Sequence, residues 1–151
     1  MADIRSKALK LLSQREHTRL ELRRKLAGGE ESREDLDALL DDFAARGWQS
    51  DARFAIAYVD ANAARFGRFR LENELQQRGV AEPLIRAALA QLPSEDNELS
   101  RARTVWLKKF RQPASEPAER AKQARFLQTR GFSHDIIRRV ITGWNEEDSN
   151  D

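Results

Sequence analysis

The sequence predicts an all-α protein, an elongated array of three tandem three-helix repeats with about nine short helices. Three observations predict this fold. Apolar residues recur at helical spacing along almost the whole chain, whereas long stretches of period-two alternation are absent and β-branched residues are scarce. Short Arg–Gly–apolar sequences end helices at three places, and one helical pattern is repeated with a period of 49 to 52 residues.

The first repeat is expected over residues 1–49. Its first helix begins at Ile4 and carries apolar residues at helical spacing. Thr18, with a glutamate three positions later, forms a capping box, in which the hydroxyl accepts a free N–H and the carboxylate reaches back. This box predicts the start of the second helix. Ser32 caps the third helix, and Gly47 ends it with a left-handed turn.

The second repeat is expected over residues 50–93. Its first helix is capped by Ser50 or by Asp51. Gly67 aligns with the capping threonine of the first repeat, so the next helix is expected to start there, and Gly79 ends it. The third helix of this repeat follows directly after that glycine.

The third repeat is expected over residues 94–144. Pro113 stops its first helix, and Pro117 lies in the first turn of the second, where its missing N–H costs nothing. Ser133 caps the last helix. An acidic tail, expected to be frayed, occupies residues 145–151.

The three repeats align without gaps in their second and third helices. One copy of this size buries too little apolar surface to be stable alone, so the copies are expected to stack and share a core. Such arrays present long binding surfaces. The aligned positions are Leu26, Leu75 and Leu127, then Leu36, Ile85 and Ile137, then Leu40, Leu89 and Ile141, together with Arg19, Arg68 and Arg120 and, more loosely, Leu9, Val59 and Leu107.

Composition argues against several classes of protein. The 151 residues include no cysteine and only two histidines, which excludes a disulfide scaffold and a thiolate metal site. No phosphate-binding glycine motif is present, and no apolar run is long enough for a membrane span. Ser133, His134 and Asp135 are adjacent, so they cannot converge as a catalytic triad. We therefore expect a cytoplasmic protein that is not an enzyme and uses no cofactor or metal.

Basic residues gather at comparable places in the three repeats, and arginine predominates over lysine. Each cluster alone is often a solvated helix face, but three of them favour a partner that carries negative charge. The candidate binding residues in these clusters are Arg23, Arg24, Lys25, Arg65, Arg68, Arg70, Lys108, Lys109 and Arg111.

Aromatic residues have two interpretations. Arg65 to Arg70 interleaves basic and aromatic side chains, as single-strand binders do when bases stack on rings. The repeat favours the alternative that Phe66 and Phe69 are core residues. Similarly, Trp48, Trp106 and Trp144 are either stacking platforms or, as we favour, wedges between helices.

Several motifs in the first 90 residues resemble the RecX family, and residues 128–132 match more loosely. The resemblance lies in Ala8-Leu9-Lys10-Leu11-Leu12-Ser13-Gln14-Arg15, Glu21-Leu22-Arg23-Arg24-Lys25-Leu26, Gly47-Trp48-Gln49-Ser50-Asp51-Ala52-Arg53-Phe54-Ala55-Ile56-Ala57-Tyr58-Val59, Arg65-Phe66-Gly67 and Glu74-Leu75-Gln76-Gln77-Arg78-Gly79-Val80. Chain length and triplication also agree with this family.

The resemblance implies a bacterial cytoplasmic regulator of the RecA recombinase, active in homologous recombination, DNA repair and the SOS response. Such a protein binds the filament of RecA on single-stranded DNA and inhibits its ATPase, strand exchange and co-protease activities, by groove binding or by blocking filament growth. It has no catalytic site. We expect a monomer that contacts RecA and single-stranded DNA through the nine candidate basic residues, with double-stranded DNA as a further candidate partner. The alternative is a direct nucleic-acid-binding module that acts through its basic patches.

Overall fold

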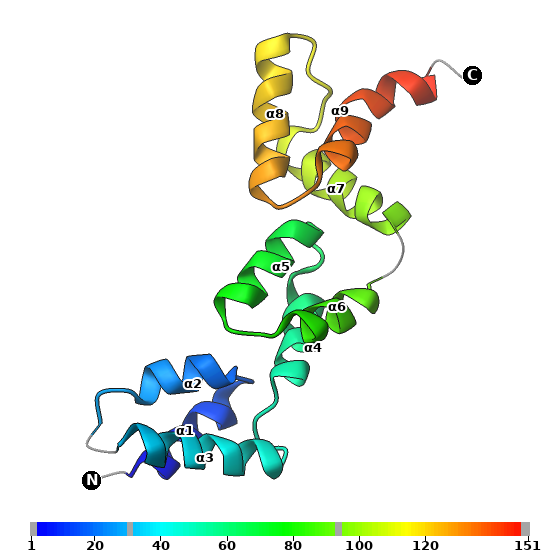
Figure 1. Ribbon diagram of the computed structural model, residues 1–151. Helices are drawn as coiled ribbons and strands as arrows, with labels where there is room; N and C mark the ends of the chain where they lie inside the picture. The colour runs from blue at the N-terminus through cyan, green and yellow to red at the C-terminus, as the bar shows by residue number, and fades with distance from the viewer. Residues whose placement is uncertain (1–2, 30–31, 93–94, 149–151) are drawn as a thin grey trace. The chain divides into compact units, whose positions relative to one another are not determined.

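The computed structural model describes residues 3–29, 32–92 and 95–148, and every regular element in these ranges is an α-helix (Figure 1). This confirms the all-α prediction and three helices in each repeat. The nine helices in this part of the chain are α1 (Ile4–Gln14), α2 (Arg19–Leu26), α3 (Arg33–Ala45), α4 (Asp51–Asn62), α5 (Arg68–Gln77), α6 (Glu82–Ala90), α7 (Glu95–Phe110), α8 (Pro117–Thr129) and α9 (His134–Asp148).

The helices begin where polar side chains can satisfy their free N–H groups. The Thr18 hydroxyl accepts the N–H of Glu21 at 3.1 Å, and the Glu21 carboxylate accepts the N–H of Thr18 at 3.0 Å, which confirms the capping box. Ser32, Ser50 and Ser133 each accept the N–H three positions later, at 3.1 to 3.2 Å. Ser50, rather than Asp51, therefore caps α4.

The helix ends at the Arg–Gly–apolar sequences share one geometry. Gly47, Gly79 and Gly131 have φ values of 75°, 82° and 91°, a left-handed conformation that side chains disfavour. The residue after each glycine returns a hydrogen bond to the last helical turn, as the Phe132 N–H does to the Leu127 carbonyl at 3.2 Å. These local signals therefore set the helix boundaries as the sequence predicts.

The chain divides into two compact units, and the division falls inside the second repeat. The first unit combines residues 1–58 with 75–88, and the second combines 59–74 with 89–151. In the first unit α1 packs on α2 and α2 on α3. The buried core of these three helices consists of Ala8, Leu22, Leu26, Leu36, Leu40 and Phe43.

The second unit contains a core of its own, in which α7, α8 and α9 pack against one another. Trp106 is fully buried there, and its indole N–H donates to the Gln123 side-chain carbonyl at 2.9 Å. The wedge interpretation is therefore correct for this tryptophan. The core consists of Leu99, Ala102, Trp106, Leu127, Phe132, Ile136, Ile137 and Val140.

Several aromatic and aligned apolar residues are exposed against expectation. Phe66 is buried, but Phe69 is 57% exposed, because the core positions at the start of α5 are taken by Phe66 and Leu71. Trp48 is 41% exposed, and it packs edge-on against Phe43 at a centroid distance of 5.4 Å instead of wedging between helices.

The structure also differs from the sequence analysis at one aligned apolar position and at the end of the chain. Leu9 and Leu107, aligned with the buried Val59, are 40% and 48% exposed. This aligned position therefore belongs to the core in the second repeat alone. Helix α9 runs to Asp148 and includes part of the expected frayed tail, because no proline or glycine follows position 143 to end it. The side chain of Trp144 lies outside the described residues. So do Glu30 and Glu31, an acidic pair in the sequence that lacks the spacing of a metal-binding motif.

Within the described residues, no helix has both the length and the apolar character needed to cross a membrane.

Candidate functional site

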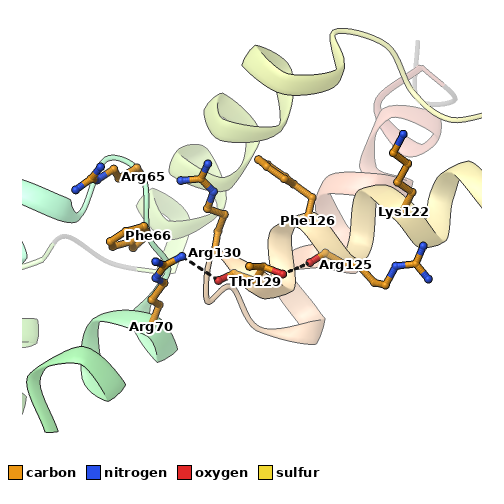
Figure 2. Close-up of a pocket in the computed structure, with 8 residues that line it drawn as sticks. All are labelled: Arg65, Phe66, Arg70, Lys122, Arg125, Phe126, Thr129 and Arg130. Carbon is orange, nitrogen blue, oxygen red and sulfur yellow. Dashed lines mark hydrogen bonds between the residues drawn. The ribbon is translucent and has the colours of Figure 1, made fainter. Parts of the chain in front are cut away.

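Five basic side chains and two phenylalanines surround one hollow in the second compact unit, which we name the Arg–Phe pocket (Figure 2). Its volume is about 540 Å³, and no carboxylate belongs to its lining. The lining residues come from the α4–α5 loop, the first turn of α5 and one side of α8. They are Arg65, Phe66, Arg70, Lys122, Arg125, Phe126, Thr129 and Arg130.

Two glycines bring these segments together. The Gly67 N–H donates to the Arg130 carbonyl at 2.7 Å, so the α4–α5 loop is hydrogen-bonded to the end of α8. A Cβ at Gly67 would lie 2.5 Å from the Gly131 carbonyl oxygen, and a Cβ at Gly131 would lie 2.4 Å from the Arg70 nitrogen. Only glycine fits at both positions, because the two backbones are in direct contact.

The first ring of the pocket supports guanidinium groups. Phe66 is 7% exposed, the Arg70 guanidinium carbon lies 3.9 Å from its ring centroid, and that of Arg65 lies 4.8 Å away. A covered ring of this kind offers little face to a nucleotide base. We therefore interpret Phe66 as a cation–π support that orients Arg65 and Arg70, rather than as a stacking platform.

The second ring, that of Phe126 on α8, also supports basic groups. Arg130 and Lys109 lie 5.2 and 5.8 Å from the Phe126 ring centroid, and Phe110 packs against its edge at 5.3 Å. Lys122, Arg125 and Thr129 are spaced by three and four residues, which places them along one side of this helix. Figure 2 shows these α8 side chains beside the loop that carries Arg65 and Phe66.

The positive charge of the pocket is only weakly neutralised. Arg70 donates to the Thr129 carbonyl at 3.3 Å and lies 3.9 Å from the Glu74 carboxylate. Within the described ranges, no carboxylate lies within ion-pair distance of Arg65, Lys122, Arg125 or Arg130. Uncompensated guanidinium groups with free donors are the usual partners of phosphate oxygens.

A further cation, Arg101, contacts the backbone of Phe66. Arg101 is half-buried and donates to the Phe66 carbonyl at 3.3 Å. Burial lowers the pKa of its guanidinium, and the Glu98 carboxylate partly opposes that effect. Since an arginine remains charged at neutral pH even so, Arg101 adds to the positive potential around Phe66.

The predicted binding residues of the second and third repeats are divided. Arg65 and Arg70 line the pocket, and Lys109 borders it through Phe126. Arg68 instead pairs with Glu72 on the same helix at 3.2 Å. Of the three arginines predicted between residues 65 and 70, the structure thus places two in the pocket.

Lys108 and Arg111 are exposed and do not line the pocket. Arg111 follows the end of α7 with a φ of 65°, the one left-handed residue other than glycine in the described chain.

The basic cluster of the first repeat is elsewhere, in the first compact unit. Arg23 forms an ion pair with Asp37, and the Lys25 ammonium lies 3.2 Å from the His17 Nε2. His17 is buried, its Nδ1 lies 3.0 Å from the Arg15 carbonyl, and burial lowers the pKa of its ring. Arg24 is exposed. This cluster is therefore largely engaged in contacts within the protein.

Sequence reasoning did not identify Lys122, Arg125 and Arg130 as candidates. These residues are separated by two and four others, so they form no visible basic run. One signal was present, because the repeat alignment that pairs Leu26 with Leu127 also pairs Arg24 with Arg125.

Metal and triad chemistry have no geometric basis in the part of the chain that the structure describes. No group of three histidine, aspartate or glutamate side chains is placed to hold a metal ion there. The Ser133 hydroxyl accepts the Ile136 N–H at 3.2 Å, which makes it a helix cap.

Three family models match this chain. They are described as the first, second and third three-helix domains of RecX, and they cover residues 5–43, 50–89 and 95–141. Together these matches include most of the chain and all nine helices in whole or in part.

Curated relatives named Regulatory protein RecX are similar over nearly the whole length. The relative from Chromobacterium violaceum is 44% identical over 145 residues, which cover 96% of this chain and 93% of the relative. The one from Ralstonia pickettii is 43% identical over 95% of this chain and 89% of its own. The one from Neisseria meningitidis serogroup B is 40% identical over 95% of each. These names describe regulation and no catalysis.

Solved structures share the fold. The crystal structure of RecX from Lactobacillus salivarius superposes with a TM-score of 0.78 at 21% identity and covers 95% of both chains. A second one, titled crystal structure of regulatory protein RecX, has a TM-score of 0.77 at 26% identity and covers 93% of this chain and 74% of its own.

Proposed function

This chain belongs to the RecX family, and we propose on that basis that it is a regulator of the RecA recombinase. It binds the filament that RecA forms on single-stranded DNA and inhibits ATP hydrolysis, strand exchange and co-protease action. The observation that carries the proposal is the match of all three RecX domains along this one chain. A cytoplasmic monomer without cofactor is sufficient for this role.

Repetition gives the proposal a physical basis. A filament presents the same surface at every protomer, and three similar helical domains can contact neighbouring protomers together. Linked weak contacts add through effective concentration, so no single domain needs high affinity. Binding that favours an inactive arrangement of protomers lowers hydrolysis without any chemistry by the regulator.

The test is a titration of this protein into RecA, ATP and single-stranded DNA. We expect ATP hydrolysis and strand exchange to fall as the ratio of regulator to RecA rises. Undiminished hydrolysis and exchange at saturating ratios would reject the proposal. A parallel assay of RecA-stimulated repressor cleavage measures the co-protease activity.

A second function, direct binding of nucleic acid, is favoured by the Arg–Phe pocket. Four of its basic residues have no carboxylate partner in the described chain, and its rings hold guanidinium groups in place. This chemistry suits the phosphodiester backbone and is independent of base identity. Single-stranded DNA is the expected ligand, and duplex DNA is tested alongside.

A matched pair of variants tests this second function. The triple variant Lys122→Ala, Arg125→Ala, Arg130→Ala removes pocket cations, and Arg15→Ala, Arg46→Ala, Arg53→Ala removes as many from ion pairs of the first compact unit. Binding to a labelled oligonucleotide is measured against salt concentration.

For a single strand, the slope of log affinity against log salt falls by about 0.7 for each phosphate that the protein no longer neutralises, so the slope of the pocket variant should be smaller by about 2 units. The control variant should keep the wild-type slope. Equal slopes for the pocket variant and the wild type would reject the pocket as the nucleic-acid site.

A further inference from the structure

A second hollow lies on a different side of α8, between that helix and α9, and it has an apolar floor with a basic rim. Its volume is about 500 Å³. Ile137 and Ile141 form the floor, where two alanines leave space. The lining residues are Arg120, Ala121, Ala124, His134, Ile137, Arg138, Ile141 and Thr142. We name it the α8–α9 groove.

The equivalent face of the first repeat is crossed by ion pairs. Positions 101 residues earlier are matched by the alignment of Leu26 with Leu127, and they lie on α2 and α3. There Arg23 pairs with Asp37, and Arg19 pairs with Asp41 at 2.7 Å. Both pairs run from one helix to the other, so charged side chains span this face.

The third repeat carries neither pair. Ala124 replaces the arginine of the first pair, and Arg138 replaces its aspartate, so the charge at that position is reversed. Thr142 replaces the second aspartate and leaves Arg120 without its cross-helix partner. The α8–α9 pair thus has an open apolar groove where the equivalent α2–α3 pair has a surface covered by ion pairs.

The rim retains donors for a ligand. Among the described side chains, the ion-pair partner of Arg138 is Asp135 on its own helix, at 3.2 Å, and both side chains are more than 60% exposed, so solvent weakens that pair. Arg120 donates long hydrogen bonds of 3.4 and 3.5 Å to two backbone carbonyls. A guanidinium has five donors, so both groups have capacity for further acceptors.

We infer that the α8–α9 groove is a docking site for an acidic amphipathic segment of a partner protein. Apolar side chains of that segment cover Ile137 and Ile141, and its carboxylates face Arg120 and Arg138. The apolar floor distinguishes this groove from the Arg–Phe pocket, because a phosphate backbone gains nothing from contact with isoleucine. A helix laid in a groove is a common mode of peptide recognition.

The probe is a fluorescein-labelled synthetic peptide of about 16 residues, with leucines at helical spacing and glutamates at most other positions. One comparison peptide keeps the leucines and replaces glutamate by lysine, and another keeps the glutamates and replaces leucine by serine. Fluorescence anisotropy with the full chain should show the acidic amphipathic peptide binding at least about tenfold more tightly than either. This binding measurement contains neither RecA nor DNA, so its result is independent of the proposed function.

A variant that installs the first-repeat ion pair locates the binding. Ala124→Arg with Arg138→Asp places an arginine and an aspartate across the groove, as the first repeat does, and it should weaken the acidic peptide at least about tenfold. Thr142→Asp, which offers Arg120 a carboxylate, should also weaken it and serves if the double variant misfolds. Arg46→Ala, which removes a cation of the first compact unit far along the chain from the groove residues, is the control and should leave peptide binding unchanged.

Three results would overturn the inference. One is that the acidic peptide binds no better than its comparison peptides. Another is that the groove variants, folded by circular dichroism, bind it as the wild type does. The last is that a single-stranded oligonucleotide displaces the peptide even from the Lys122→Ala, Arg125→Ala, Arg130→Ala protein, which would assign the groove to nucleic acid.

Discussion

The two compact units use arginine in different ways. In the first unit arginines face carboxylates, in the pairs Arg5–Asp42, Arg15–Glu21, Arg19–Asp41, Arg23–Asp37, Arg46–Asp42 and Arg53–Glu16. Arg46 of the first unit also lies over a ring, that of Trp48, in addition to its carboxylate partner. In the second unit Arg65 and Arg130 lie against phenylalanine rings without such a partner among the described residues, and the described ion pairs are within single helices. Basic residues of the second unit are therefore less fully neutralised by acidic residues of the same chain and are more available to a partner.

The distribution of acidic residues explains the difference. Residues 28–51 contain eight acidic residues, several of them on α3, which packs on α2. Residues 101–112 contain five basic residues and no acidic one. The repeats thus share a backbone pattern but differ in the distribution of charge. Substitutions in the two units are therefore expected to have different effects.

The largest expected effect comes from breaking the backbone contact that builds the pocket. Gly131→Ala adds a Cβ at a left-handed φ and against the Arg70 backbone, and it should lower the free energy of unfolding by at least about 3 kcal/mol. Urea unfolding followed by circular dichroism measures this.

Gly28→Ala is the control, since Gly28 has a similar φ of 92° but no atom within 4 Å of an added Cβ. It should cost only about 1 kcal/mol. Equal losses in the two variants would mean that the close contact in the second unit contributes nothing.

A smaller effect is expected from making the pocket resemble the first unit. Thr129→Glu places a carboxylate between Arg70 and Arg125 and should lower affinity for single-stranded DNA about tenfold at low salt. Oligonucleotide anisotropy measures this, and Thr129→Gln, of the same size without charge, is the control. If glutamate and glutamine act alike, charge is not what the pocket provides.

His17 and Lys25 provide a test within the first unit, because there a lysine faces an imidazole in place of a carboxylate. Burial lowers the pKa of His17, so the folded state favours the neutral ring, and the unfolded chain binds the proton more readily. This contribution to stability is complete above the unfolded pKa of about 6.5 and is lost as the pH falls below it, with a slope of at most about 1.4 kcal/mol per pH unit.

Unfolding free energies of the wild type and of His17→Gln between about pH 5 and 8 measure that slope. The difference between the two proteins should change below about pH 6.5 and stay constant above it. A difference that does not vary with pH would mean that the ring titrates alike in both states.

The smallest effect is expected from freeing first-unit arginines. Asp37→Asn with Asp41→Asn removes the partners of Arg23 and Arg19. Affinity for single-stranded DNA should rise a few-fold at low salt, and stability should fall by less than about 1 kcal/mol for each exposed pair. The same anisotropy assay measures the gain, and unchanged affinity would contradict the view that these carboxylates keep the cluster occupied.

Helix boundaries were predictable because their causes are local. Thr18 and Glu21 are three residues apart, and Gly47 acts within one turn, so neighbouring residues carry the whole signal. Phe69 was misassigned because the core positions at the start of α5 are taken by Phe66 and Leu71, and this segment is also held by a contact between Gly67 and Gly131, which are 64 residues apart. Local periodicity contains no record of such a contact.

Arg65 and Arg70 of the candidate site were predicted from the sequence, whereas its basic residues from α8 and the turn after that helix were not, and the reason is geometric. Consecutive basic residues such as Arg23 and Arg24 are conspicuous in a sequence, yet successive helical residues point about 100° apart and do not form one surface. Lys122 and Arg125 share one side of α8 because they are three residues apart, and Arg130 joins them from the turn after the helix, so the three form no visible basic run. A search at helical spacing is therefore the better guide to basic surfaces in an all-α chain.

The two triple alanine variants, compared in one RecA ATPase titration on single-stranded DNA, test the central claim most directly. The account predicts that the Lys122, Arg125 and Arg130 variant requires several-fold more protein for the same inhibition, whereas the Arg15, Arg46 and Arg53 variant inhibits as the wild type does. Inhibition retained by the pocket variant and lost by the ion-pair variant would contradict it.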